Sequence, residues 1–275
     1  MSFTTADVVK LRKVTGAGMM DCKNALAEAE GNFDRALEII RERGKLVASK
    51  RADREAAEGV VLAKVNETNK VGAMVVLNCE TDFVAKNENF IAFAGSILNI
   101  ALENNAENLD ALKEMQLDGR TIETQVTEQT GIIGEKIELS YYKKINAESV
   151  ISYIHPGNKL ATIVGFNKAG VEVQVAKDVA MQVAAMAPMA IDKDSVPAEV
   201  IAKELEIARE KYRQEGKPEA MLDKIAQGAL VKFFQEATLL NQTYVKDGKI
   251  SIRDFLTQSD KGLTVTEFDR YSLSV

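Results

Sequence analysis

Apolar side chains in the first 50 residues recur with the spacing of amphipathic helices, and polar or glycine-containing turns separate three such stretches. Thr4 or Thr5 can cap the first helix, which turns Val8 and Leu11 inward. A turn over residues 15–18 precedes the second helix. The apolar stripe of the second helix has gaps of three, four and three positions and consists of Met19, Cys22, Leu26 and Ala29.

A third amphipathic helix follows Gly31, which ends the second helix, and Asn32, which caps the third. Gly44 is predicted to end this helix, and its inward face consists of Phe33, Ala36, Leu37 and Ile40. Three short helices of this kind predict a miniature bundle, similar in plan to ubiquitin-associated domains. So thin a core would be marginal by itself. Together with a charged, alanine-rich helical linker, the bundle is predicted to span residues 1–54.

The apolar period changes to that of β-strands near residue 60. Residues 60–65 alternate as in a strand, and 71–79 form a nearly unbroken apolar strand, which we expect to be central and covered on at least one face. A helix capped by Asn87 or Asn89 follows, and its inward residues are Phe90, Phe93, Ala94, Ile97 and Ala101. The first core subdomain, predicted over 55–146, is completed by two helical stretches and a strand, at 109–117, 121–131 and 136–145.

A similar succession of elements begins near residue 150 and predicts a second core subdomain over 147–275. Its order, a strand hairpin and then a helix, resembles that of the first half and indicates two related subdomains. The predicted strands and helices of this second half lie at 150–154, 160–166, 173–187, 252–256 and 263–272.

Two charged helices with narrow apolar seams are predicted within residues 196–234, joined by a turn at Gly216, Lys217 and Pro218. The seams consist of Ile201, Leu205, Ala208 and Tyr212, and of Leu222, Ile225, Ala229 and Phe233. This pattern predicts an antiparallel coiled-coil hairpin, which is either purely structural or an arm for protein contact. The fold class is therefore predicted to be α+β, with a three-helix bundle, two core subdomains with antiparallel sheets and a protruding helical hairpin.

The charge balance argues against a nucleic-acid partner, because the formal net charge is -6 and non-specific affinity for nucleic acid needs clustered Lys and Arg. Basic residues do cluster over 41–54, but acids interleave with them, which favours a solvated helix face. Cys22 and Cys79 lie in apolar stretches and are expected to be buried free thiols rather than one disulfide. The N-terminus does not resemble a signal peptide, and the apolar runs are too short for a bilayer. We therefore expect a cytoplasmic protein without membrane contact.

The usual motifs of catalysis and cofactor binding are not found in the sequence. His155 is the only histidine, neither cysteine lies near another Cys or His, and no nucleophile-elbow pattern occurs. Gly16 and Gly18 lack the third glycine of a dinucleotide-binding loop and follow a helix rather than a strand. No phosphate-binding GxxxxGK[ST] run is present. We therefore expect no catalytic, metal or cofactor site, and a chain that is not an enzyme.

Three stretches resemble the bacterial elongation factor Ts family, and the likeness runs in order from about Thr4 to the C-terminus. Residues 11–26, which read LRKVTGAGMMDCKNAL, resemble the family's N-terminal signature, and residues 78–87, NCETDFVAKN, resemble its central signature. The hairpin around Gly216-Lys217-Pro218, with Lys232-Phe233 beyond it, is similar to the family's protruding coiled coil. The first two motifs are long enough to be specific.

The resemblance implies a protein that binds elongation factor Tu, the GTPase that carries aminoacyl-tRNA to the ribosome, and speeds release of its GDP so that GTP can bind. It implies that the family's Thr-Asp-Phe-Val segment disrupts the partner's magnesium site, a role that falls here on Thr81, Asp82, Phe83 and Val84. It also implies contacts of the bundle with the partner's nucleotide domain and of a His-x-Gly loop with a second domain. These contacts fall on Leu11, Met19 and Met20, and on His155 and Gly157.

Some of these residues also have a plainer structural interpretation. An isolated loop phenylalanine such as Phe83 can fold back on its own core, although the resemblance favours an exposed wedge. Because Met19 and Met20 are adjacent, a helix cannot bury both on one stripe, so Met20 is expected to face outward. His155 can simply belong to a turn, and Asn158-Lys159 stand where family members often have Gly-Arg. Asn tolerates a positive φ, so that turn can persist.

Two other function classes remain open on sequence grounds. A passive scaffold or chaperone-like module would bind a partner without changing its nucleotide, and a hydrolase would depend on His155. The role of the hairpin also remains open, between bracing the complex with the partner and joining two copies into a homodimer or a two-plus-two complex.

Overall fold

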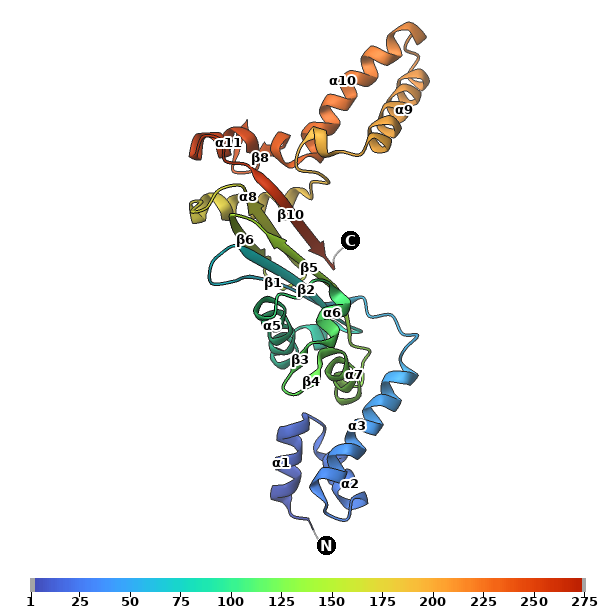
Figure 1. Ribbon diagram of the computed structural model, residues 1–275. Coiled ribbons are helices and arrows are strands. Elements are labelled where there is room, and N and C mark those ends of the chain that lie inside the picture. The colour runs from blue at the N-terminus through green and yellow to red at the C-terminus, as the bar shows by residue number, and fades with distance from the viewer. Residues whose placement is uncertain (1–2, 274–275) are drawn as a thin grey trace.

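The computed structural model describes residues 3–273 as an elongated molecule with a helical bundle at one end and a helical hairpin at the other (Figure 1). Two three-stranded antiparallel sheets lie between them, flanked by helices. The predicted α+β class is confirmed. Within the described residues, no helix combines the length and the apolarity needed to cross a membrane.

Three helices form the N-terminal bundle: α1 (Thr5–Thr15), α2 (Met19–Glu28) and α3 (Phe33–Lys50). Thr4 caps α1, since its hydroxyl accepts a hydrogen bond from the backbone N–H of Asp7 and its own N–H donates to the Asp7 carboxylate. Asn32 caps α3, as predicted. The buried core of the bundle consists of Val8, Leu11, Ala17, Cys22, Ala25, Leu26, Ala29, Ala36 and Ile39.

Met19 was expected on the buried stripe of α2, and this prediction was wrong. The residue is the first of the helix and is 41% exposed, while the inward positions are taken by Cys22, Ala25 and Leu26. Ala17, in the turn before α2, is buried in the bundle core at this end of the helix. The bundle therefore leaves the Met19 side chain at its surface.

The prediction that Gly44 ends the third helix was also wrong, because α3 continues without interruption to Lys50. Gly44 is buried where α3 crosses α7 (Ile122–Ile133) and lies against Gly131 of that helix. A Cβ added at Gly131 would lie 2.1 Å from the Cα of Gly44. The glycines thus permit a close helix crossing, which the sequence pattern of a single helix does not reveal.

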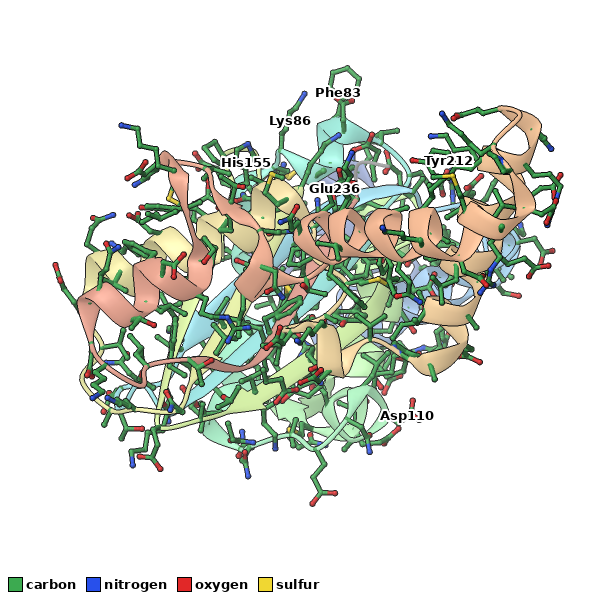
Figure 2. The ribbon with its side chains drawn as sticks, turned by 90° about the horizontal axis from the view of Figure 1, so that it is seen from above. Phe83, Lys86, Asp110, His155, Tyr212 and Glu236 are labelled. Carbon is green, nitrogen blue, oxygen red and sulfur yellow. The ribbon has the colours of Figure 1, made fainter. Side chains whose placement is uncertain are left out.

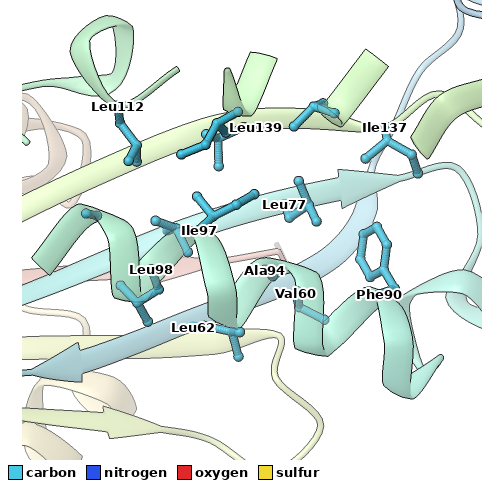
Figure 3. Packing of buried hydrophobic residues seen from close by; sticks show 14 of the residues in the cluster. Val60, Leu62, Leu77, Phe90, Ala94, Ile97, Leu98, Leu112, Ile137 and Leu139 are labelled. Atoms are coloured by element: carbon cyan, nitrogen blue, oxygen red, sulfur yellow. The ribbon is translucent and has the colours of Figure 1, made fainter. Parts of the chain in front are cut away.

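The first sheet has the order β1-β2-β5, with β1 at Glu58–Val65, β2 at Val71–Cys79 and β5 at Glu138–Asn146. Strand β2 is central and has the bounds that the sequence predicts. Helices α5 (Glu88–Glu103) and α6 (Leu109–Glu114) cover one face together with α7. Figure 3 shows this packing, in which Leu77 and Leu139 of the sheet lie among Ile97, Leu98 and Leu112 of the helices.

The second sheet has the order β10-β7-β6, with β6 at Ser149–Ile154, β7 at Leu160–Phe166 and β10 at Val265–Ser272. In both sheets a hairpin comes first, and a later strand pairs antiparallel with the second strand of that hairpin. The outer face of this sheet is covered by α8 (Val173–Met186) and α11 (Ile252–Ser259).

The two sheets pack against each other through their inner faces. The cluster between them contains Val61, Ala63, Met74, Val76, Ile145, Val150, Ala161 and Ile163. A Cβ added at Gly72 of β2 would lie 2.6 Å from a methyl group of Val150 in β6, so the sheets approach closely there. The core is therefore layered as helices, sheet, sheet, helices, which buries β2 on both faces and explains its nearly unbroken apolar sequence.

The predicted hairpin is formed by α9 (Ala198–Gln214) and α10 (Glu219–Ala237), which extend away from the sheets (Figure 1). Ion pairs of Arg209 with Asp223 and of Arg213 with Glu219 join the two helices. Short elements that the sequence did not predict are two small ribbons and two 3-10 turns. These are β3 (Gln116–Leu117) with β4 (Arg120–Thr121), β8 (Thr243–Tyr244) with β9 (Asp247–Ser251), Lys193–Ser195 and Leu239–Asn241.

We predict that Ile97→Ala lowers the free energy of unfolding by about 2–5 kcal/mol, because a fully buried side chain of α5 leaves a cavity against the first sheet. Gly95→Ala on the same helix is the matched control, since a Cβ there meets nothing within 4 Å and alanine favours a helix over glycine by about 1 kcal/mol. Urea unfolding followed by circular dichroism measures both. Equal stabilities of the two variants would contradict the packing of Ile97 against the first sheet.

Candidate functional site

The segment after β2 makes a tight turn that holds Phe83 away from the protein. Thr81 precedes the single helical turn α4 (Asp82–Ala85). Ala85 is buried and Val84 packs against the first core cluster, so the inner side of the turn is occupied. Phe83 is 84% exposed and projects from the surface in Figure 2. The alternative in which this phenylalanine folds back on its own core is therefore not what the structure shows.

Glu135, in the segment between α7 and β5, fastens the start of this turn. Its carboxylate accepts hydrogen bonds from the backbone N–H groups of Glu80 (3.1 Å) and Thr81 (3.0 Å) and from the Thr81 hydroxyl (2.6 Å). Charge-assisted hydrogen bonds of this kind are roughly twice as strong as neutral ones. The backbone that carries Phe83 is thus held from a segment 54 residues further along the chain.

Glu80 makes a second set of contacts at the same place. Its carboxylate accepts a hydrogen bond from the backbone N–H of Lys136 at 2.6 Å and pairs with Arg51 at 2.7 Å. The hydrogen bond from Lys136 and the guanidinium of Arg51 lower the pKa of Glu80. Glu80 therefore stays ionised and joins the turn to the residue that follows helix α3.

Charged side chains lie near the exposed ring. Asp82 pairs with Lys86 at 2.6 Å, and this hydrogen bond is the main reason why the pKa of Asp82 is lowered. Lys159, which pairs with Glu58 at 2.8 Å, also acts electrostatically on Asp82. Phe83 is thus an exposed apolar side chain next to charged groups.

Cys79, the last residue of β2, lies buried beneath the turn, and its thiol donates to the backbone oxygen of Thr81 at 3.2 Å. Burial, together with the negative charges of Glu135 and Glu58, raises the pKa of the Cys79 thiol to about 12. Burial also raises the pKa of the Cys22 thiol. Both cysteines are free, as the sequence predicts.

The loop that contains His155 and Gly157 lies at the same end of the first sheet as Phe83 (Figure 2). The N–H of Val61 in β1 donates to the backbone oxygen of Asn158 at 2.7 Å. His155 is exposed, and its Nδ1 lies 2.9 Å from the Tyr153 hydroxyl. Gly157 and Asn158 have φ angles of 92° and 57°, so the turn keeps a left-handed conformation with asparagine at its second position.

The bundle presents a second apolar surface, distinct from the Phe83 turn. Met19 and Met20 are 41% and 63% exposed on α2. Leu11, by contrast, is completely buried in the bundle core, so the expectation that it contacts a partner is wrong for its side chain. The helical pattern, which turned Leu11 inward, was the better guide. Val9 and Val14 of α1 are exposed instead and were not singled out in the sequence.

The residues that sequence reasoning missed are those that support the turn, namely Glu135, Glu80 and Arg51. Glu80 lies within the 78–87 motif, but its supporting role was not recognised, and no motif marks Glu135 or Arg51, because each acts through a partner far away in the sequence. The basic cluster over 41–54, interpreted as a solvated helix face, is in fact partly paired. Arg41 contacts Glu128, Arg43 contacts Glu28 and Arg51 contacts Glu80.

Within residues 3–273, no group of three or more His, Cys, Asp or Glu side chains is arranged to hold a metal ion. The site consists of an exposed aromatic ring on a braced turn beside an exposed loop.

Comparison with known proteins assigns this arrangement to a family. A family model described as elongation factor TS matches residues 80–274, which include the whole turn and the His155 loop. The chain belongs to the elongation factor Ts family. It is 52% identical over 275 residues to an elongation factor Ts of Azobacteroides pseudotrichonymphae, with all of both chains covered.

Two further members of the elongation factor Ts family show how far the likeness extends. The protein from Porphyromonas gingivalis is 52% identical, with 100% of this chain and 99% of the relative covered. The protein from Bacteroides fragilis is 41% identical over 330 aligned positions, with 99% of each chain covered. The resemblance drawn from the sequence motifs is confirmed, and it places the chain among the elongation factors of protein biosynthesis.

The buried thiols give a testable prediction. We expect Cys22 and Cys79 to react slowly with a thiol-specific disulfide reagent at pH 8, because both are buried and both thiols have raised pKa values. In denaturant, both should react at once. A spectrophotometric thiol titration with and without guanidinium measures the difference. Rapid reaction of two thiols in the native protein would contradict the burial of Cys79 beneath the turn.

Proposed function

We propose that this chain binds elongation factor Tu in its GDP form and promotes GDP release by disrupting the magnesium and nucleotide site, after which GTP binds. Membership of the elongation factor Ts family supports the general role in translation elongation. The proposed disruption of the magnesium and nucleotide site is supported by the 84% exposure of Phe83 on a turn that is held by Glu135 and Glu80.

An aromatic ring in water is a source of binding energy. Burying a phenylalanine side chain in an apolar pocket contributes about 1.5–3 kcal/mol. Because the turn is already fixed by hydrogen bonds, little conformational entropy is lost when the ring enters a partner. Phe83 is therefore suited to act as a wedge between elements of another protein.

The wedge acts on nucleotide affinity through the magnesium ion of the partner. Magnesium bridges the phosphate oxygens of a bound nucleotide and is held by side chains of the GTPase. Displacing the elements that carry those side chains weakens the binding of both magnesium and GDP to the partner. By linkage, GDP weakens binding of the exchange factor by the same factor, and a coupling of about 3 kcal/mol corresponds to roughly 150-fold.

The remaining predicted contacts complete the proposal. Thr81, Asp82 and Val84 belong to the same turn and set the position and charge around the ring. Met19 and Met20 are proposed to contact the nucleotide domain of the partner, and His155 and Gly157 to contact a second domain. No bond is made or broken, so the chain acts as a binding protein rather than an enzyme, in the cytoplasm where translation takes place.

Two stoichiometries fit this proposal, a one-to-one complex and a two-plus-two complex in which two copies of this chain pair. Analytical ultracentrifugation of the chain alone and with elongation factor Tu separates them. A passive scaffold would bind the partner in the same experiment without changing the rate of GDP release.

Phe83→Ala should slow the release of fluorescent GDP from elongation factor Tu by about 10-fold or more at a fixed, sub-saturating concentration, because losing roughly 1.5–3 kcal/mol of burial energy removes that much stabilisation of the complex. Stopped-flow fluorescence measures the rate. Val245→Ala is the control, since Val245 is another exposed apolar side chain, outside the turn and the loop. If GDP release in the presence of the Phe83→Ala variant is as fast as with the wild type, Phe83 does not act as a wedge.

Glu135→Gln should reduce the maximal rate of GDP release several-fold, because a neutral amide accepts weaker hydrogen bonds from Glu80 and Thr81 and loosens the turn without altering Phe83 itself. Glu148→Gln is the matched control, since Glu148 is an exposed carboxylate in a surface ion pair with Lys70 at 3.4 Å. The same stopped-flow experiment, extended to saturating concentrations, provides the measurement. A maximal rate equal to that of the control would show that the bracing has no role in exchange.

A further inference from the structure

Helix α3 is longer than the bundle needs. Its first part contributes Ala36 and Ile39 to the bundle core, whereas its second part runs on to Lys50 along α7 of the first core subdomain. The same continuous helix therefore belongs to two packed units. Any change in how α3 packs on α7 shifts the whole bundle relative to the first sheet.

Helix α3 contacts α7 through two glycines. Gly44 of α3 and Gly131 of α7 face each other with no side chain between the helices. A Cβ added at Gly131 would come within 2.1 Å of the Gly44 Cα, which no relaxation of side chains can relieve. A Cβ added at Gly44 would lie 3.6 Å from the Gly131 Cα, which is an ordinary van der Waals distance. The crossing is therefore sensitive to one glycine and tolerant at the other.

Charged groups secure the crossing on one side. The carboxylate of Glu128, one turn before Gly131, pairs with Arg41 of α3 at 3.4 Å and with Arg120 of β4. The Glu128 side chain is only 12% exposed, so water screens these pairs weakly. Removing its charge leaves two arginines without their common partner.

The far end of α3 leads directly to the Phe83 turn. Arg51, the residue after the helix, pairs with Glu80, and Glu80 directly precedes Thr81. At its other end α3 packs against α2, which carries Met19 and Met20. One rigid helix thus joins the exposed methionines of the bundle to the exposed phenylalanine of the core.

We propose that Gly131 is a positioning residue, which lets α3 pack closely on α7 at Gly44 so that the bundle surface and Phe83 meet one partner molecule at a fixed spacing. The inference rests on the proposed function. When two linked surfaces are held at the correct spacing, the second contact forms at a high effective concentration, and the overall affinity exceeds that of either surface. When the close packing of α3 on α7 is lost, each surface can still bind the partner, but the two surfaces are no longer held at the spacing that lets them bind together.

Gly131→Ala is the decisive variant and Gly44→Ala its control at the same contact. In Gly131→Ala, we expect the concentration that gives half-maximal GDP release from elongation factor Tu to rise on the order of 10- to 100-fold. The maximal rate should stay within about twofold, because Phe83 and the hydrogen bonds from Glu80 and Thr81 to Glu135 do not involve α3. Gly44→Ala should leave both quantities unchanged, and so should Gly95→Ala, a helical glycine with free space around it.

The spacing is measured directly in the free protein. Spin labels on Lys23→Cys in α2 and Glu103→Cys in α5, both exposed positions, report the distance between the bundle and the core by pulsed electron resonance. The natural cysteines are buried and take little label. We expect a narrow distance distribution in the wild type and in Gly44→Ala, and a broad or shifted one in Gly131→Ala.

Glu128→Gln provides a second variant that keeps the helix crossing sterically free, in case Gly131→Ala also unfolds the small bundle. It should also raise the half-maximal concentration, by several-fold, with an unchanged maximal rate.

Equal effects of Gly131→Ala and Gly44→Ala, or a broadened distance distribution with unchanged half-maximal concentration, would overturn the proposal. If the wild type fails to accelerate GDP release, the proposed function is wrong, whereas the distance measurements still decide whether the glycine crossing sets the spacing.

Discussion

Burial of strand β2 on both faces is the constraint on which the rest of the structure depends. One face of the strand packs against helices α5, α6 and α7, and the other packs against the second sheet. Both of its edges are paired, with β1 and with β5. A slip of one residue would exchange the side chains that pack on the two buried faces, so the packing on both sides opposes a change of register. The position of its last residue, Cys79, is therefore fixed, and with it the origin of the turn that carries Phe83.

The turn itself combines an unfavourable feature with strong local support. An exposed phenylalanine does not stabilise the folded monomer, so other groups must maintain the conformation of its turn. The carboxylates of Glu135 and Glu80 do this through hydrogen bonds to the backbone and through the ion pair with Arg51. Polar contacts position the ring, and the apolar surface of the ring remains available for a partner. This division of roles is what a preorganised binding element requires.

Local patterns were sufficient for most of the elements and for part of the site. The caps at Thr4 and Asn32, the bounds of β2 and β7, and the paired helices of the hairpin follow from periodicity and turn residues. The exposed turn at Thr81–Val84 and the His155 loop were located through their resemblance to the elongation factor Ts family. Two errors of helical pattern, at Met19 and Gly44, occurred where a residue with a familiar local role had a different role set by a neighbouring element. The third error, at Leu11, came from the family resemblance and not from the helical pattern.

The sequence by itself determined the α+β class, the central apolar strand, the free thiols and the family, because each depends on residues that are close together in the chain. Only the tertiary structure decided that Glu135 holds Thr81, that α3 continues past Gly44 onto Gly131, and that Met19 is exposed. These features depend on contacts between segments that are far apart in the sequence. A pattern read along one segment cannot specify which distant side chain or backbone will face it, since that is settled only when the layers pack together.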